Sequence, residues 1–235
     1  NQWTSQETRW LDLDAWDESA GLVVETKLEG RACYAGLDLA NTTDIAALVL
    51  VFPMDDGTFE SLSYFWIPGD NIQERVRRDR VPYDAWVAQG LITATEGNVI
   101  DYAAIEAKIK QLSARFNIRE VGFDRWGATQ LSQNLQAENV TVVPIGQGFA
   151  SMSAPTKELL NLTLAKRMRH GGHPVLRWMA DNMVVSTDPA GNIKPNKSKS
   201  REKIDGMVAL IMALDRAIRN ENAPSKYERE GLLVI

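Results

Sequence analysis

The sequence contains one cysteine, Cys33, and two histidines, so it can form neither an internal disulfide nor a cysteine-rich zinc site. It also lacks a long hydrophobic run. The longest extends over residues 45–54 and includes a proline, whereas a membrane-spanning helix needs about 20 apolar residues. Glycine (16) and proline (9) are too few for a collagen-like or low-complexity chain. These absences exclude membrane and fibrous proteins, and the scarcity of cysteine favours a reducing, intracellular setting.

The composition that remains is that of a globular protein, with 44% hydrophobic and 24% charged residues. A chain of 235 residues can bury a substantial core and does not require two domains. The formal net charge of -5 argues against a protein that coats nucleic acid through bulk charge. It leaves room for a local basic groove beside an acidic site.

Residues 1–30 differ from the rest because Trp3, Trp10 and Trp16 lie among several acids. Exposed tryptophans are costly, so we expect this segment to pack against this domain or a preceding one. The chain starts at Asn1 without a signal-peptide pattern, which predicts a fragment of a longer protein. We therefore interpret residues 1–30 as a linker, 31–220 as one domain and 221–235 as a tail.

Three strands are predicted at the start of this domain. Residues 31–39, 45–52 and 58–67 are rich in apolar and β-branched residues, and an Asp-Gly turn separates the last two. This pattern predicts an antiparallel meander.

Helices and strands then alternate, which is typical of parallel β-α-β packing. Residues 71–116 look mostly helical. The predicted elements that follow are strands at 119–123 and 140–145, helices at 128–138, 156–168 and 174–183, a hairpin around 188–192, and a closing helix at 201–219. The predicted fold is an α/β mixed central sheet, with three antiparallel strands and then parallel strands, flanked by helices.

Three aspartates stand out at separate positions. Asp38 lies within the first strand on the same face as Gly36, which leaves space for a close approach, and an acid there needs a partner or a metal. Asp124 ends a parallel strand, where ligands bind in open α/β sheets, although it also suits a helix N-cap. Asp205 begins the closing helix, where the helix dipole alone would favour it, but Gly206 implies that something approaches the helix closely.

The three acids share one explanation if the fold brings them together. Three clustered carboxylates repel one another, and two divalent cations about 3.5–4 Å apart would neutralise them and form a phosphoryl-transfer site. Mg²⁺ or Mn²⁺ suits such oxygen ligands.

Several stretches resemble the ribonuclease-H-like nuclease domain of the large terminase subunit of tailed bacteriophages. They are GLDLANTTDIAALVLVF (36–52), GFDRWGATQL (122–131), QGFASMSAPTKELL (147–160), MRHGGHPVLRWMADNMVV (168–185) and GNIKPNKSKSREKIDGMVALIMAL (191–214). The resemblance implies a genome-packaging endonuclease that cuts concatemeric double-stranded DNA. It places the catalytic, metal-binding acids at Asp38, Asp124 and Asp205, where related terminases often have glutamate at the second position.

The resemblance also implies partners and a location. An ATPase motor precedes this domain in the family, and the present sequence lacks the Gly-x-x-x-x-Gly-Lys-Ser/Thr loop of such a motor. The small terminase subunit, the portal and double-stranded DNA are the expected partners, in the cytoplasm of the infected bacterium and transiently at the prohead. Asp38 is expected to bridge both metals, and Asp44 is either a supporting acid or a solvated turn residue.

Cations near Asp205 suggest a path for DNA phosphates. The expected DNA-binding residues are Lys194, Lys197, Lys199, Arg201, Lys203 and Arg169. A group of arginines at 75–80 is interpreted as a solvated helix face or a contact to another domain. His170 and His173 are expected to be structural or to face phosphates.

Other functions stay open on the sequence alone. A junction resolvase or transposase of the same fold would share the acids, and a non-catalytic module for docking to the portal or binding DNA would not need them. Sugar kinases and actin-like ATPases also begin with a strand carrying aspartate, but they need a glycine-rich phosphate turn, and Asn41-Thr42-Thr43 has no glycine.

Overall fold

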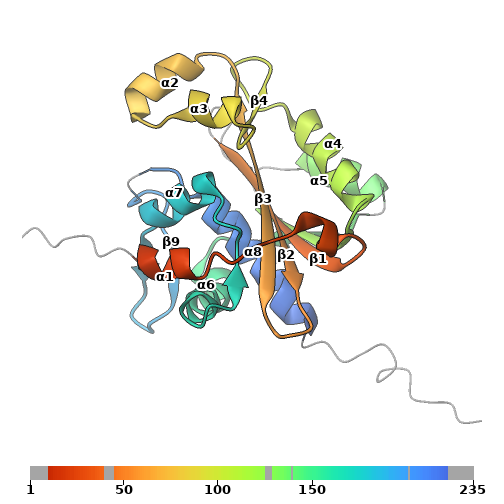
Figure 1. Ribbon diagram of the computed structural model, residues 1–235, viewed down its shortest axis with the longest axis vertical. Helices are drawn as coiled ribbons and strands as arrows, with labels where there is room; N and C mark the ends of the chain where they lie inside the picture. The colour runs from red at the N-terminus through yellow and green to blue at the C-terminus, as the bar shows by residue number, and fades with distance from the viewer. Residues whose placement is uncertain (1–9, 40–44, 125–128, 139, 201, 222–235) are drawn as a thin grey trace, which may run out of the picture.

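The computed structural model describes residues 10–39, 45–124, 129–138, 140–200 and 202–221. Its centre is a mixed sheet with the order β4-β3-β2-β1-β5-β6, and the short strand β7 pairs with β3 (Figure 1). The strands are β1 (Ala32–Asp38), β2 (Ala46–Pro53), β3 (Phe59–Pro68), β4 (Thr93–Thr95), β5 (Asn117–Asp124), β6 (Val142–Ile145) and β7 (Met168–Arg169). The first three are antiparallel, and β5 and β6 continue parallel to β1, so the predicted sheet is confirmed.

Helices cover both faces of this sheet, as the sequence predicts (Figure 1). One core lies between the sheet and α1 (Leu13–Glu18), α6 (Phe149–Leu164), α7 (Pro174–Asn182) and α8 (Asp205–Glu221). The other lies under α4 (Tyr102–Ser113) and α5 (Thr129–Ala137). Because side chains alternate along a strand, Ala35 and Leu37 enter the second core while Gly36 and Asp38 face α8. In the described part of the chain, no helix is long and apolar enough to cross a membrane.

The region predicted as mostly helical, 71–116, is more varied than expected. It contains α2 (Ile72–Asp79) and α3 (Tyr83–Ala88), and then β4, which pairs in parallel with the end of β3 before α4 begins. Gly90 and Gly97, both at positive φ, separate these elements. The prediction that this region is mostly helical therefore missed β4, because an edge strand forms only through pairing with its partner strand.

Helix α6 also begins earlier than predicted, at Phe149 in place of residue 156, and continues through Pro155. Pro155 lacks an amide donor, which normally interrupts a helix. Here it is buried with Met152 and Leu159 on the face that packs against the core, so tertiary packing offsets the lost hydrogen bond. The predicted helix end at 168 is wrong as well, because Met168 and Arg169 form β7.

The segment before β1 packs onto the domain. It consists of α1 and a 3-10 turn, η1 (Glu25–Leu28). Trp16 is fully buried and stacks on His170 with a centroid separation of 3.9 Å, and Ser19 Oγ donates to the Met168 carbonyl. Trp16 therefore belongs to the core of this domain, in agreement with the expectation that this segment packs on it. His170 has a structural role. Trp3, Asp44 and the predicted tail from residue 222 lie outside the described residues.

A separate hairpin precedes α8, as predicted. Its strands are β8 (Val185–Thr187) and β9 (Ile193–Pro195). The amide of Ile193 donates to Ser153 Oγ on α6, so the hairpin is attached to the helix layer beside the sheet. It carries the chain directly to the turn at 196–200 and then to the start of α8.

Candidate active site

Gly36 brings β1 and α8 unusually close together. A Cβ atom at this position would lie 1.9 Å from the Ala209 carbonyl oxygen and 2.7 Å from the Ala213 nitrogen, so only glycine fits. The sequence interpretation that Gly36 leaves room for a ligand is therefore wrong, because the backbone of α8 occupies that space. Gly206 has a similar explanation, since a Cβ there would lie 2.7 Å from the Phe65 ring and 2.9 Å from Met179 Sδ.

This contact places two of the predicted acids at the same point. Asp38 lies two residues beyond Gly36 on the same strand face, and Asp205 lies about one helical turn before Ala209. The two side chains meet at a third one: Lys197 Nζ is 2.6 Å from Asp38 Oδ2 and 2.8 Å from Asp205 Oδ1. A single ammonium group thus bridges carboxylates that are far apart in the sequence.

Both acids are buried, with 1% of Asp38 and 3% of Asp205 exposed. The pKa of Asp38 is raised to about 7, mainly by burial; Lys197 opposes this shift and the neighbouring Asp205 adds to it. Burial alone would lower the pKa of Lys197, but the two carboxylates outweigh it and raise that pKa above the ordinary value. The site is therefore a negatively charged recess that holds a cation.

Gln147 is a further member of the site. Its Nε2 donates to Asp38 Oδ1 at 3.3 Å, and its carbonyl oxygen accepts from Lys194 Nζ at 3.4 Å. The Lys194 ammonium also lies 5.2 Å from the centre of the Phe149 ring, within cation–π range. Sequence reasoning missed Gln147, although it lies inside one of the stretches that carry the family resemblance.

Asp124 lies on the neighbouring strand. Leu37 pairs with Phe123 in parallel register, so Asp124 follows at the level of Asp38, on a strand about 4.8 Å away. Its carboxylate does not complete a three-acid group: among the residues that the structure describes, no three acidic, histidine or cysteine side chains are placed to hold a metal. The structure brings Asp38 and Asp205 together and leaves the convergence of Asp124 as a prediction.

The chemistry of the donor set fits a divalent cation. Carboxylate oxygens from Asp38 and Asp205, with the Gln147 side chain beside them, are ligands of the kind that Mg²⁺ and Mn²⁺ take. The Lys197 ammonium lies between the two carboxylates and contacts one oxygen of each. A positive charge is needed at this point, because two buried carboxylates without one would be strongly destabilised.

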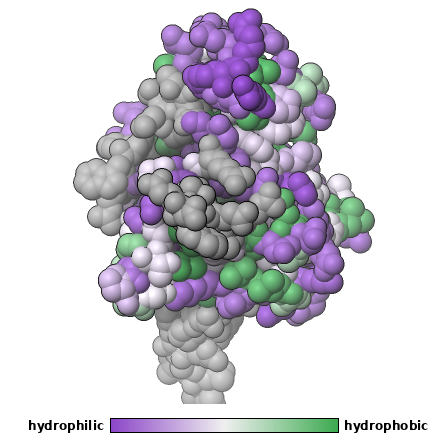
Figure 2. All heavy atoms as spheres, turned by 90° about the vertical axis from the view of Figure 1, so that its left-hand side faces the viewer, coloured by the Kyte–Doolittle hydropathy of each residue, from purple (hydrophilic) through white to green (hydrophobic). Residues whose placement is uncertain are grey.

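The predicted DNA-binding cations occupy different places. Lys199 is exposed on the turn before α8, and Lys203 lines a cleft of about 660 Å³ with Arg75 and Arg78 of α2. This cleft adjoins the strongly hydrophilic surface of α2, at the top of Figure 2. Arg75 and Arg78 thus share a cleft with Lys203, which the interpretation of residues 75–80 as a solvated face or a domain contact did not anticipate.

Two of the expected cations do not join this surface. Arg169 lies on β7 at the opposite edge of the sheet from Asp38, where it pairs with Glu60 and Asp56 at 3.4 and 3.3 Å. Lys197 points inward to the acids. Arg201 lies outside the described residues. His173 is partly buried, and burial lowers its pKa to about 4, so it is neutral near pH 7.

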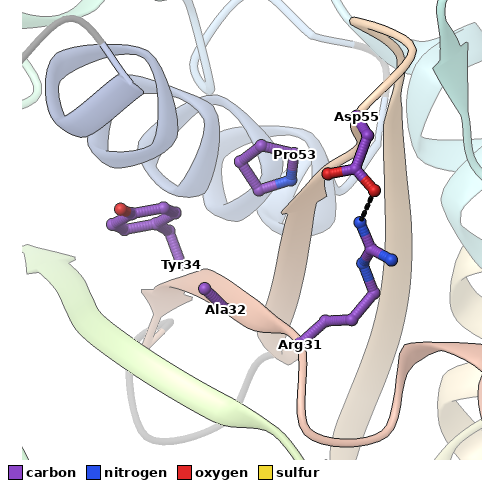
Figure 3. A pocket seen from close by; sticks show the side chains of 5 residues that line it. All are labelled: Arg31, Ala32, Tyr34, Pro53 and Asp55. Atoms are coloured by element: carbon purple, nitrogen blue, oxygen red, sulfur yellow. Dashed lines mark hydrogen bonds and ion pairs between the residues drawn. The ribbon is translucent and has the colours of Figure 1, made fainter.

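A second pocket, of about 400 Å³, lies at the amino end of β1 (Figure 3). Arg31, Ala32, Tyr34, Pro53 and Asp55 line it, and Arg31 pairs with Asp55 at 2.8 Å. It is at the other end of β1 from Asp38 and holds no acidic pair. The buried acids and their cation therefore lie at the carboxyl end of β1, where ligand sites of α/β sheets usually lie.

A mixed sheet of this order, with acids at the ends of β1 and β5 and on the closing helix, defines a ribonuclease-H-like nuclease fold. The chain belongs to the family described as "Terminase large subunit, endonuclease domain", whose sequence model matches residues 1–221.

Individual relatives agree with this assignment. The large terminase subunit of Enterobacteria phage HK97 is 38% identical over 219 residues, which cover 92% of this chain and 43% of that protein. The crystal structure of the HK97 large terminase superimposes with a TM-score of 0.82 at 37% identity, covering 89% of this chain and 43% of that one. This chain thus spans less than half the length of that relative.

A more distant structure shares the fold alone. The large terminase nuclease from thermophilic phage G20c, solved with bound magnesium, gives a TM-score of 0.57 at 14% identity, covering 89% of this chain and 99% of that one. The predicted family and fold class are confirmed.

Proposed function

We propose that this domain is a metal-dependent DNA endonuclease that cuts concatemeric double-stranded DNA during viral genome packaging. The observation that carries the proposal is the buried pair Asp38–Asp205, joined by a cation at the carboxyl end of β1. Membership of the terminase family supports a DNA substrate, and the magnesium-bound G20c nuclease supports a divalent ion.

Asp38 and Asp205 would hold the metal, with Asp124 completing the set of ligands. When bound, a pair of Mg²⁺ or Mn²⁺ ions supplies activation of the attacking water and stabilisation of the leaving 3′ oxygen. The chain itself supplies rigid placement. Asp38 is fixed by the sheet, Asp205 by the first turn of α8, and Gln147 orients the Asp38 carboxylate through its hydrogen bond.

The packaging context is also a proposal. An ATPase motor in the same chain, the small terminase subunit and the portal would bring DNA to this site in the cytoplasm of the infected bacterium. We assign the approaching DNA to the face formed by the 194–203 segment and the α2 cleft, because Lys194 contacts Gln147 beside Asp38, and Lys203 of that cleft lies two residues before Asp205. We also propose that residues 1–30 are a linker, part of which packs on the nuclease domain at 31–220, and that residues 221–235 are a tail.

Plasmid cleavage tests the proposal directly. The chain should convert supercoiled plasmid into linear fragments with Mg²⁺ or Mn²⁺, without sequence preference, and should be inactive in excess EDTA. Asp38→Asn, Asp124→Asn and Asp205→Asn should each reduce cleavage by at least about 10³-fold, because each removes a charge needed in the transition state. Circular dichroism should show that the variants stay folded.

Asp188→Asn is a matched control, since this partly exposed hairpin carboxylate accepts hydrogen bonds only within its own turn, as far as the structure describes the chain. Normal cleavage by all three site variants would refute the assignment of the site. Loss of cleavage with Asp38→Asn and Asp205→Asn but not with Asp124→Asn would restrict the site to the pair that the structure joins.

A further inference from the structure

The cation between the two buried acids belongs to the protein itself. Lys197 Nζ lies within 2.8 Å of an oxygen of both Asp38 and Asp205, while 41% of the Lys197 side chain stays exposed. The acids are almost fully enclosed, with 2% and 4% of their side chains exposed. The ammonium therefore closes the mouth of the recess, and it can leave without any opening of the core.

The backbone around Lys197 is held firmly. Asn196 Oδ1 accepts from the amides of Ser198 and Lys199, and the Asn196 amide donates to the Val184 carbonyl. Ser200 Oγ accepts from the Val184 amide and donates to the Asn196 carbonyl. This turn fixes where the lysine side chain starts, so exchange between the inward position and solvent requires only side-chain rotation.

We propose that Lys197 is a built-in competitor of the divalent ion. It neutralises Asp38 and Asp205 and keeps their carboxylates in place while the metal is absent, and it must leave before a metal can bind. Two cations cannot share this space, because like charges a few ångströms apart repel by several kcal/mol in a partly buried site. Lys197 is thus a positioning residue that lowers metal affinity and keeps the acid pair preorganised. This inference rests on the proposed metal-dependent function.

Metal binding by Lys197→Met, measured by isothermal titration calorimetry with Mn²⁺ on the whole chain, tests the inference without any cleavage assay. Methionine is unbranched like lysine, is one atom shorter, and removes the charge. We expect Mn²⁺ to bind at least about tenfold more tightly than to the wild type, because the competing charge is gone. The metal-free variant should melt at a lower temperature than the wild type, and Mn²⁺ should raise its melting temperature by a larger amount.

Two comparisons separate this role from a merely structural one. Lys197→Arg keeps a cation and should keep the weak metal binding of the wild type. Lys27→Met removes an exposed charge near the other end of β1 and should leave Mn²⁺ affinity unchanged.

Equal or weaker Mn²⁺ binding by Lys197→Met would overturn the inference. If the wild type cleaves DNA all the same, the proposed function survives and only the role of Lys197 fails. If neither protein binds Mn²⁺, both proposals fail together.

Discussion

Gly36 of β1 and Ala209 of α8 touch through their backbones, with no side chain between them. This contact fixes the spacing between the strand that carries Asp38 and the helix that carries Asp205. Asp38 lies two residues beyond Gly36 on β1, and Asp205 lies four residues before Ala209 on α8. The two acids meet at the carboxyl end of β1 because the closing helix is packed this tightly against it.

Replacing Gly36 with alanine should therefore damage both stability and the site. The new Cβ would lie 1.9 Å from the Ala209 carbonyl oxygen, and the helix must move to accommodate it. Overpacking of this kind costs about 1–3 kcal/mol, and we expect the upper end or more because backbone is displaced. Urea unfolding measures the loss. Gly148→Ala is the control, because nothing lies within 4 Å of its Cβ position, and it should change stability by less than about 1 kcal/mol. Equal stability of the two variants would contradict the packing argument.

Replacing Gln147 with leucine should weaken cleavage without abolishing it. The variant loses the donor to Asp38 Oδ1 and leaves a buried carboxylate oxygen less satisfied. A lost hydrogen bond to a charged group costs about 1.5–3 kcal/mol, which corresponds to roughly ten- to hundredfold in rate if it is expressed in the transition state. Initial rates of plasmid cleavage at saturating Mn²⁺ measure the effect.

Gln136→Leu, at an exposed position of α5, should cleave at the wild-type rate. A wild-type rate for Gln147→Leu would show that the orientation of Asp38 does not depend on this hydrogen bond.

Replacing Lys199 and Lys203 together with glutamine should weaken DNA binding and make it less sensitive to salt. Each lysine that neutralises a phosphate contributes about 0.9 to the slope of log K against log salt, so the slope should flatten by up to about 2. Fluorescence anisotropy with labelled duplex at several salt concentrations, in EDTA, measures the slope. The double variant Lys27→Gln, Lys166→Gln removes the same charge from exposed positions elsewhere. Identical slopes for both double variants would exclude the 194–203 segment from the DNA surface.

His170 should lower the stability of the fold as the pH falls from about 6.5 to 4, and Asp38, whose pKa is raised, should offset part of this loss. The Nε2 of His170 donates to the Trp16 carbonyl and its Nδ1 accepts from the Gly172 amide, so the buried ring is bound as the neutral form. Burial lowers its pKa from 6.5 to about 4, although Asp17 nearby favours the charged form. Between these values the unfolded chain binds more protons at His170 than the folded one, so this contribution to stability is complete above about pH 6.5 and is lost toward pH 4.

The variant His170→Phe keeps the ring stacked on Trp16 and removes the titration. Its free energy of unfolding, measured by urea titration at several pH values, should change less steeply over this range. Part of the slope should persist, because burial also lowers the pKa of His173 to about 4. A slope identical to that of the wild type would show that His170 does not contribute.

Local patterns were sufficient to predict the main strands and most helices, because alternating or helical spacing of apolar residues reflects local geometry. They failed at β4 and β7, which are short and depend on pairing with β3. They also failed at the start of α6, where the buried face of the helix overrides the local preference of Pro155.

The sequence by itself determined the antiparallel meander followed by parallel strands, the family, and the candidate acids, because these rest on residue types and on contiguous patterns. The tertiary structure alone decided which groups meet. Lys197 belongs to a run of similar cations, and only the fold, which places the turn at 196–200 beside Asp38 and the start of α8, brings it between Asp38 and Asp205. The same holds for Gln147, which contacts Asp38, and for Arg169, which lies away from the acids on β7. The partners of a side chain follow from where its backbone lies in three dimensions, and the spacing of residues along the chain does not specify this.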